Sequence, residues 1–258
     1  MIGIFDSGIG GLTVVKELLK KLPEYRVIYF GDTAHLPYGT KSKKAVREFS
    51  DQAVNFLIKR GAKIILIACN TSSAQAANYL KKRHPNTLII DVINPAIDKI
   101  KKMDLKNVGV IATPGTIKSE IYQKKLRRMG KIVISQATPL LVPFIEEGIV
   151  KGKTLNEILR IYLKPFKKNT KGIVLGCTHY PLIEKSIKSV LPKGVLTVNP
   201  SKIIVEHLDE LLRKNKNLDK KLKRGHKYEF FVSDDPYKFE TLSRLAMGKK
   251  IKAEIVKL

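Results

Sequence analysis

The chain of 258 residues has no tryptophan, only two cysteines and far fewer acidic than basic residues. No stretch approaches the roughly 18 consecutive apolar residues of a membrane span, so we expect no membrane partner. The N-terminus, MIGIFDSG, lacks the basic region, apolar stretch and small-residue cleavage site of a secretory signal. We therefore expect a cytoplasmic protein in which both cysteines are reduced thiols.

The excess of positive charge is large. Lysine and arginine number 49 against 23 aspartates and glutamates, which gives a formal net charge of +26. Such a charge can serve an acidic partner such as nucleic acid. The lysines are spread over nearly every helix-like segment, however, without interleaved aromatic residues for stacking bases. We interpret most of them as a solvated surface, and the nucleic-acid alternative rests on the densest basic run, residues 213–227.

Short β-branched runs alternate along the chain with amphipathic, lysine-rich segments of helical periodicity. Runs that are apolar on both faces are typical of buried parallel strands, and their alternation with helices predicts an α/β fold. The expected strands are residues 2–5, 26–30, 63–68, 87–92, 108–112, 131–135, 172–176, 195–198 and 228–232.

The two cysteines end similar stretches of sequence. Cys69 follows ILIA, Cys177 follows IVLG, and upstream of them IGIFDSG (2–8) resembles VGVIATP (108–114). The separation along the chain is also nearly the same in the two cases. We infer two related α/β units. Because ligands of open α/β sheets bind beyond the carboxyl ends of the strands, two such units face to face would close a site between them, with one thiol from each side.

The loop DSGIGG (6–11) lies between an expected strand and a helix-like segment. Its glycines suit an anion at a helix N-terminus or simply a tight turn, and they match neither the dinucleotide pattern nor the Walker pattern. Asp6 could hydrogen-bond the turn, cap the helix, receive a proton or orient a substrate ammonium group.

Several roles are open for the thiols. They could be small buried hydrophobic groups. Zinc would have poor ligand spacing with Cys177, His179 and one remote cysteine, so we expect no metal. A Cys177–His179 nucleophile pair would make a thiol hydrolase that is indifferent to Cys69. Alternatively, the two thiols act as acid and base on opposite faces of one carbon, since a thiol of pKa about 8.5 can be shifted toward neutrality and then both take and give a proton.

A series of motifs resembles the cofactor-independent glutamate racemases of the aspartate/glutamate racemase superfamily. The motifs are GIFDSGIGGLTV (3–14), GDTAHLPYG (31–39), ACNTSSA (68–74), VIATPGTIKS (110–119), PLLVPFIEEG (139–148) and LGCTHYPLI (175–183). The resemblance implies an α/β fold of two domains related by a pseudo-two-fold, with central, largely parallel sheets and the active site between them. Residues 1–92 plus 207–258 would form the first domain and residues 93–206 the second.

The resemblance also implies roles for single residues. Cys177 would remove the α-proton of L-glutamate and Cys69 that of D-glutamate, and each would reprotonate the opposite face. Asp6 and His179 match the groups that assist the thiols, and Glu146 matches a further acidic residue near the site. The substrate would be held by Asp6, Ser7, Tyr38, Gly39, Asn70, Thr71, Thr178 and His179, with Thr113 and Thr116 as weaker candidates.

The implied activity is a cofactor-independent racemisation that supplies D-glutamate for peptidoglycan synthesis. A racemase of aspartate or another amino acid is the close alternative, and a basic protein that binds nucleic acid or another acidic partner is the alternative from a different class. Because the family forms homodimers, we expect one here. Some members also bind DNA gyrase, which leaves a secondary interaction with gyrase or nucleic acid open. One departure from the family is Thr138-Pro139, where members often have Cys-Pro.

Overall fold

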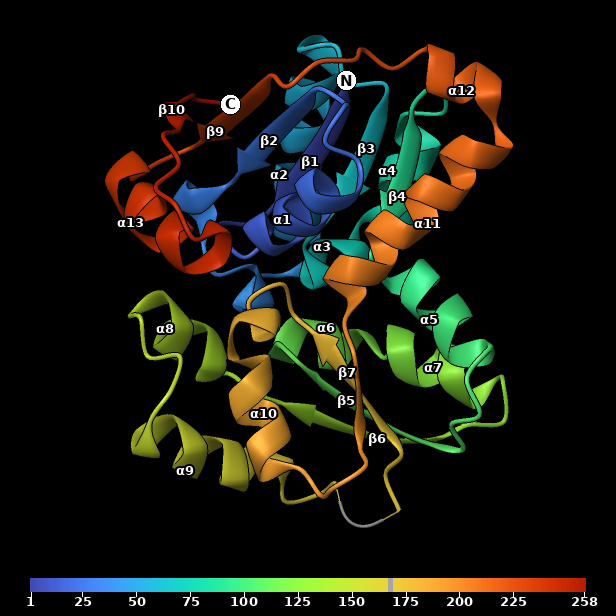
Figure 1. The fold of residues 1–258 in the computed structure, drawn as a ribbon, viewed down its shortest axis with the longest axis vertical. Helices are drawn as coiled ribbons and strands as arrows, with labels where there is room; N and C mark the ends of the chain where they lie inside the picture. The colour runs from blue at the N-terminus through green and yellow to red at the C-terminus, as the bar shows by residue number, and fades with distance from the viewer. Residues whose placement is uncertain (167–168) are drawn as a thin grey trace.

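The computed structural model describes residues 1–166 and 169–258 and contains two sheets of parallel strands, one above the other in Figure 1. The first sheet has the order β10-β9-β2-β1-β3-β4. Its strands are β1 (Ile2–Asp6), β2 (Val27–Gly31), β3 (Ile64–Ile67), β4 (Leu88–Asp91), β9 (Tyr228–Val232) and β10 (Glu254–Ile255). The second sheet, β6-β5-β7-β8, contains β5 (Asn107–Ala112), β6 (Ile132–Ala137), β7 (Gly172–Gly176) and β8 (Leu196–Val198). The predicted α/β fold is confirmed.

The two sheets repeat one arrangement of strands. The order β2-β1-β3-β4 in the first sheet corresponds to β6-β5-β7-β8 in the second. The register repeats as well, because Gly3 pairs with Ile65 and Gly109 pairs with Ile173. The sequence comparison sets these same residues opposite each other, so the structure supports the inferred duplication.

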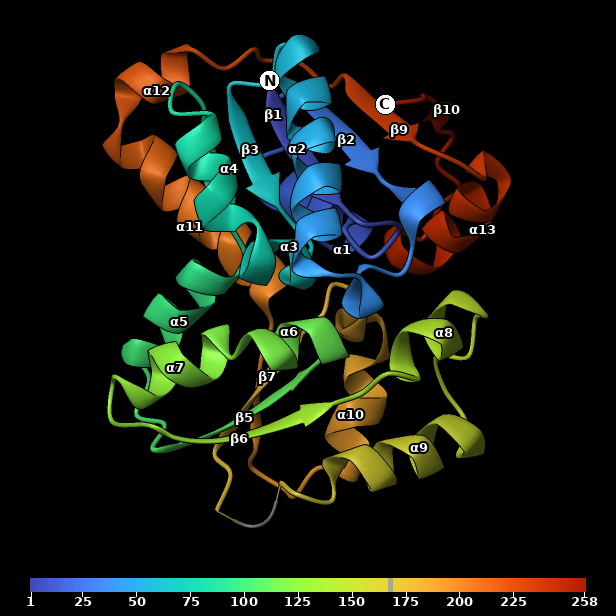
Figure 2. The same ribbon diagram turned by 180° about the vertical axis from the view of Figure 1, so that it is seen from behind.

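Helices cover both faces of the first sheet (Figures 1 and 2). They are α1 (Leu12–Lys21), α2 (Lys43–Lys59), α3 (Asn70–Gln75), α4 (Ala77–Arg83), α11 (Pro200–Lys214), α12 (Lys216–Lys220) and α13 (Pro236–Met247), with the short 3-10 helices η1 (Thr33–His35) and η2 (Tyr38–Thr40). Successive side chains of a strand point to opposite faces. In β1, Ile4 therefore joins the core that contains Leu18 of α1, whereas Phe5 joins the core that contains Val54 of α2.

The second sheet is covered in the same way. Its helices are α5 (Ile93–Lys101), α6 (Pro114–Ser119), α7 (Ile121–Arg127), α8 (Leu141–Glu146), α9 (Lys153–Leu163), η3 (Tyr180–Ile183) and α10 (Glu184–Val190). Val110 of β5 packs in a core with Leu126 of α7, and Ile111 packs on the other face with Leu159 of α9. The core that includes Val110 also includes Ile4, so apolar packing is continuous from one sheet to the other.

The expectation of strands buried on both faces is wrong at both edges of the second sheet, and Leu196 of the edge strand β8, in the predicted strand 195–198, is 51% exposed. Residues 131–135 were predicted as a strand buried on both faces, but Ile132 and Ile134 of β6 are 54% and 37% exposed. The reason is that β6 is also an edge strand of the second sheet.

The predicted domain limits follow the sheets for most of their length. Strands β1 to β4, β9 and β10 fall in residues 1–92 plus 207–258, and β5 to β8 fall in 93–206. The limit between residues 206 and 207, however, falls inside α11, a continuous helix that packs against α1. The domain limits therefore stay a proposal.

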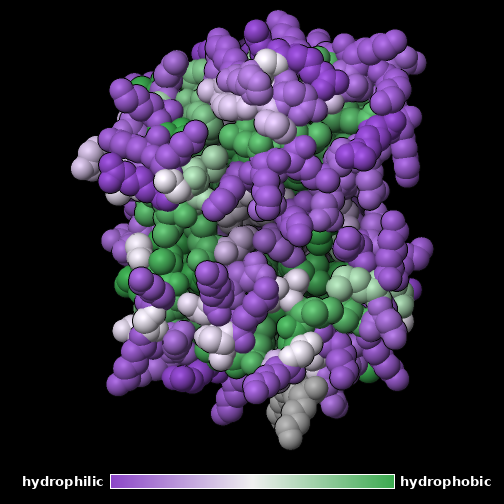
Figure 3. All heavy atoms as spheres, viewed as in Figure 1, coloured by the Kyte–Doolittle hydropathy of each residue, from purple (hydrophilic) through white to green (hydrophobic). Residues whose placement is uncertain are grey.

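The surface is largely hydrophilic. Hydrophilic residues cover most of the face shown in Figure 3, and hydrophobic residues show mainly in patches between them. In the part of the chain that the structure describes, no helix has the length and apolar character needed to span a membrane.

Candidate active site

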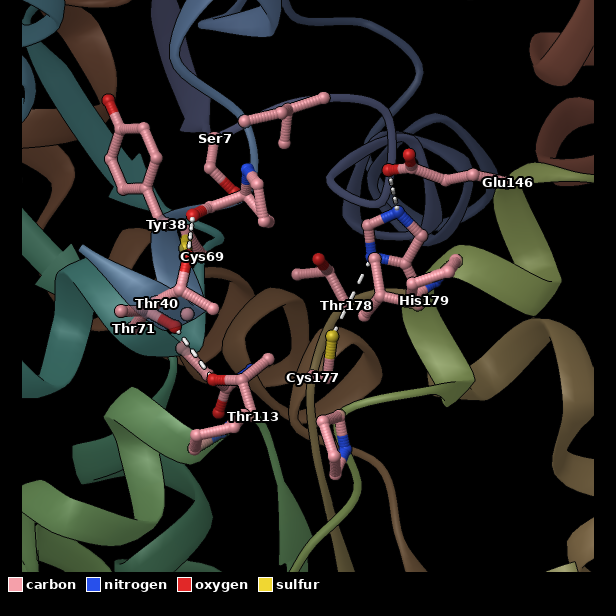
Figure 4. A pocket seen from close by; sticks show the side chains of 18 of the residues that line it. Ser7, Tyr38, Thr40, Cys69, Thr71, Thr113, Glu146, Cys177, Thr178 and His179 are labelled. Carbon is pink, nitrogen blue, oxygen red and sulfur yellow. Dashed lines mark hydrogen bonds and ion pairs between the residues drawn. The ribbon is translucent and has the colours of Figure 1, made fainter. Parts of the chain in front are cut away.

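A cavity of about 260 Å³ lies between the two sheets (Figure 4). Ser7, Cys69, Thr113 and Cys177, which follow the carboxyl ends of β1, β3, β5 and β7, all line it. This is the position that the duplicated α/β units predict. The volume is near the lower end of the roughly 300–1,000 Å³ of small-molecule sites, which fits a small ligand.

All of the predicted site residues except Asp6 and Thr116 line this cavity. The lining also includes residues that were not predicted: Leu36, Pro37, Thr40, Pro114, Pro139, Val142, Pro143 and Glu147. Apart from Thr40, these residues belong to the motifs at 31–39, 110–119 and 139–148. The motifs were a signal for them, but single residues within a motif give no sign of which side chains reach a cavity.

Cys69 and Cys177 come from different sheets and lie on opposite sides of the cavity in Figure 4. Both are free thiols, and they are 5% and 6% exposed. Cys69 lies two residues after β3 and Cys177 lies directly after β7, so that each sulfur is beyond the carboxyl edge of its own sheet and the two face the cavity from opposite sides.

The surroundings of Cys69 keep it protonated. Burial and the nearby negative charge of Asp6 raise the pKa of Cys69 to about 11, although hydrogen bonds from Ser7 and Ser72 act in the opposite direction. The Ser72 amide donates to the Cys69 sulfur over 3.5 Å, so Cys69 caps the N-terminus of α3. At neutral pH, Cys69 is therefore a neutral thiol.

The surroundings of Cys177 are different. Its sulfur lies 3.6 Å from Nδ1 of His179, and Nε2 of His179 lies 3.1 Å from Oε1 of Glu146. Burial disfavours the charged ring, but the hydrogen bonds with Cys177 and Glu146 outweigh burial and raise the pKa of His179 to about 10. For Glu146, burial raises the pKa and the bond to His179 lowers it, with a net lowering. A positively charged imidazolium ring thus stands beside the Cys177 sulfur.

Asp6 lies behind the cavity wall. It is fully buried, and its carboxylate accepts hydrogen bonds from the Gly8 amide over 3.1 Å and from the Thr178 hydroxyl over 3.3 Å. Burial raises the pKa of Asp6. Asp6 lies between the first sheet and Thr178 of the second, where its charge affects the pKa of Cys69 and its carboxylate holds the Thr178 hydroxyl. The contact of Asp6 with substrate stays a prediction.

The glycine-rich loop packs against the opposite unit. A Cβ atom added at Gly10 would lie 2.3 Å from the Thr178 hydroxyl and 2.6 Å from Nδ1 of His179. This close approach of the loop backbone to the second unit was not among the interpretations drawn from the sequence, and it requires a residue without a side chain at position 10.

Hydroxyl and amide groups make up the other polar wall. Thr71 and Thr113 are 2.9 Å apart at their hydroxyl oxygens, and Thr116 bonds to both from behind. The Tyr122 hydroxyl donates to Oδ1 of Asn70 over 2.8 Å and fixes that amide group. The Tyr38 hydroxyl donates to Asp32 over 2.5 Å, which holds Tyr38 in the wall. The wall thus offers fixed, neutral polar groups.

Comparison with known proteins identifies the family of the chain. A family model described as Asp/Glu/Hydantoin racemase matches residues 8–208. The chain belongs to this racemase family. The resemblance inferred from the motifs is therefore confirmed.

Individual members of the racemase family match nearly the whole chain. The glutamate racemases of Aquifex aeolicus and Carboxydothermus hydrogenoformans are 38% and 41% identical, over 98% and 97% of this chain and 96% and 93% of their own. The crystal structure of glutamate racemase from Francisella tularensis, in complex with D-glutamate, is 38% identical, with a TM-score of 0.91 over 99% of this chain and 97% of that one.

The basic run and possible metal ligands were also considered as functional features of the sequence. None of the residues of the basic run 213–227 lines it, and within the run Arg213, Arg224 and Lys227 form ion pairs. Within residues 1–166 and 169–258, no group of three or more His, Cys, Asp or Glu side chains is placed to hold a metal ion.

Proposed function

We propose that this protein is a glutamate racemase that interconverts L- and D-glutamate with Cys69 and Cys177 as the two bases. The observation that carries the proposal is the position of these thiols, the only cysteines of the chain, on opposite sides of one cavity. Support for glutamate as the substrate comes from the relatives that bear this name over nearly the whole chain and from the D-glutamate in the F. tularensis complex.

The reaction from L-glutamate starts with Cys177 as a thiolate beside the His179 imidazolium. The thiolate takes the α-proton, and the electron pair of the broken C–H bond passes into the α-carboxylate. The Cys69 thiol, which is protonated at neutral pH because its pKa is about 11, then gives its proton to the opposite face. When D-glutamate has formed, Cys177 is a thiol and Cys69 is a thiolate. The reverse reaction follows the same steps in the opposite order.

The supporting groups differ between the two directions. His179 and Glu146 stabilise the negative charge on Cys177 through the bonds described above. Asp6 raises the pKa of Cys69 by its charge, and a proton on Asp6 would remove that effect, so we infer that Asp6 assists Cys69. The hydroxyl and amide groups of Ser7, Asn70, Thr71 and Thr178 would hold the carboxylates and the ammonium group.

A single experiment in D₂O tests the proposal. Purified protein and L-glutamate, with no added cofactor, should show loss of the α-proton signal by NMR and decay of optical activity, and L-aspartate should not react. Activity on aspartate alone would refute the choice of substrate.

Substitution of each cysteine separates the mechanism from its alternative. Cys69→Ala and Cys177→Ala should each abolish racemisation, because inversion needs a proton donor on one face and an acceptor on the other. A thiol hydrolase would lose activity only with Cys177→Ala. Full racemase activity in either variant contradicts the two-base mechanism.

The biological role that we propose is the supply of D-glutamate for peptidoglycan synthesis. It rests on the resemblance to the glutamate racemases, as do a cytoplasmic location and a homodimeric state. Sedimentation of the purified protein tests the last of these, since a monomer at micromolar concentration would contradict it.

A further inference from the structure

The active-site cavity has little positive charge for an anionic substrate. Its lining contains Glu146 and Glu147, no lysine or arginine, and only His179 as a cationic group, which is paired with Glu146. Glutamate at neutral pH carries two carboxylates and one ammonium group, so it has one net negative charge. The wall of the cavity holds such a molecule through neutral groups, and its charges do not draw the molecule in.

A second cavity adjoins the first. It has a volume of about 800 Å³ and shares Gly39, Thr40 and Pro114 with the active-site cavity. Elements of both sheets form it, because η2 and the start of α2 come from the first and α6 from the second; Figure 2 shows α2 directly above α6. We refer to this second cavity as the vestibule.

The charge of the vestibule is entirely positive. Lys41, Lys43 and Lys118 line it, together with Ser42 and Ser119, and none of its lining residues is acidic. By contrast, Lys44 forms an ion pair with Glu48 of its own helix, and Lys124 of α7 forms one with Glu120, the residue before that helix. Among the described residues, the three vestibule lysines form no ion pair.

The start of α2 adds to this potential. Ser42 is the N-cap of this helix of 17 residues and accepts a hydrogen bond from the Ala45 amide over 3.2 Å. Because Ser42 and Lys43 line the vestibule, the positive end of the helix dipole faces it. Lysine charge and helix dipole therefore act in the same direction at the same place.

We propose that the vestibule is an anion-collecting site that concentrates the carboxylate substrate beside the active-site cavity. The proposal deepens the proposed function, on which its choice of substrate rests. Fields inside a cleft lined by charge of one sign raise the local concentration of a small ion of opposite sign. Once the substrate is inside, Lys41, Lys43 and Lys118 take no part in proton transfer.

The expected effect can be scaled from Coulomb's law. Across roughly 10 Å of water, one unit charge changes the local concentration of a monovalent anion about twofold. Removal of three lysines should then reduce anion entry about four- to eightfold at about 10 mM salt. At about 1 M salt the Debye length falls to about 3 Å, and the difference should nearly vanish.

The first measurement uses the two cysteines as reporters and needs no racemase activity. Iodoacetate, an anion, and iodoacetamide, its neutral analogue, alkylate the same thiols, and the ratio of their rates at Cys69 and Cys177 reports entry of the anion. In the variant Lys41→Gln/Lys43→Gln/Lys118→Gln, this ratio should fall about four- to eightfold at low salt. In the same variant kcat/KM for L-glutamate should fall equally, through KM, with kcat unchanged.

Two control variants make the test specific. The variant Lys63→Gln/Lys106→Gln/Lys171→Gln removes the same net charge from exposed residues that precede β3, β5 and β7, at the ends of the strands opposite the cavity, and it should behave as the unmodified protein. Replacement of the three vestibule lysines by arginine keeps the charge and should keep the ratio, which shows that a loss in the glutamine variant is not a loss of fold.

The outcomes distinguish this inference from the proposed function. An unchanged alkylation ratio and salt dependence in the glutamine variant would overturn the vestibule, even in an active racemase. An equal loss in the remote control would overturn it as well, since total charge would then be the cause. A third outcome is that the protein fails to racemise glutamate, while the ratio of the iodoacetate rate to the iodoacetamide rate falls as expected in the glutamine variant. This result would refute glutamate as the substrate and leave the anion-collecting site in place.

Discussion

The charge of His179 depends on Glu146, and this dependence gives a quantitative prediction for Glu146→Gln. The two side chains are 3.1 Å apart and only 5% and 14% exposed, so water screens their interaction weakly. A hydrogen bond to a charged group contributes about 1.5–3 kcal/mol, and about 1.4 kcal/mol corresponds to one unit of pKa. The pKa of His179, now about 10, should therefore fall by about one to two pH units.

The assay is an NMR titration of the imidazole signals, with His179 assigned from the spectrum of a His179→Gln variant. The matched control is Glu147→Gln, because Glu147 also lines the cavity but is 72% exposed and pairs with Lys238 instead. The alkaline limit of racemase activity should move to lower pH in Glu146→Gln and stay in place in Glu147→Gln. An unchanged pKa of His179 in Glu146→Gln would refute the assignment of its charge to this pair.

The same raised pKa has a consequence for stability with a definite sign. A group whose pKa is higher in the folded state than its ordinary value stabilises the fold most when it is protonated in both states. For His179 this contribution is complete below pH 6.5 and is lost as the pH rises toward about 10. In Glu146→Gln the loss of this stabilisation should begin at the same pH and be complete at a lower pH. Thermal unfolding across this pH range would measure the difference.

Two further substitutions test the geometry around each thiol. Asp6→Asn should lower the pKa of Cys69, since the charge of Asp6 raises it, and alkylation of Cys69 should then begin at lower pH in a variant that has no other cysteine; an unchanged profile would contradict the proximity of the two groups. Gly10→Ala should reduce kcat at least about tenfold. The added Cβ would lie 2.6 Å from Nδ1 of His179 and would therefore displace the imidazole ring. Activity equal to that of the unmodified protein would show that the loop adjusts without cost.

The regular part of the fold was predictable because buried parallel strands have a simple pattern. Each expected strand is present, within two residues at either end, since a run of β-branched residues between helix-like segments has few other interpretations. The two-residue strand β10 was not predicted. Both Glu254 and Ile255 are exposed, so this strand is formed by pairing with β9 and leaves no apolar run in the sequence.

The site was predictable where residues follow strands and unpredictable where it depends on contacts between elements that are far apart in sequence. Cys69 and Cys177 could be set opposite each other from the duplication alone. The bond between His179 and Glu146 could not, because α8 and β7 are far apart in sequence and no pattern distinguishes Glu146 from Glu147. The resemblance to known racemases pointed to Glu146, and in the structure its Oε1 lies 3.1 Å from Nε2 of His179; its role in catalysis stays a prediction.

The repeated register of the two sheets places the two thiols symmetrically, but the groups beside them differ. Gly3 with Ile65 and Gly109 with Ile173 place two thiols equivalently, yet one thiol has a carboxylate as neighbour and the other an imidazolium ring. Enantiomers have equal free energies in water, so the equilibrium between them is one to one and kcat/KM must be the same in both directions. In the two-thiol mechanism that we propose, the inequality of the two neighbours can therefore appear only as compensating differences in kcat and in KM. The direction that starts from the more stable thiolate gains in one constant what it loses in the other.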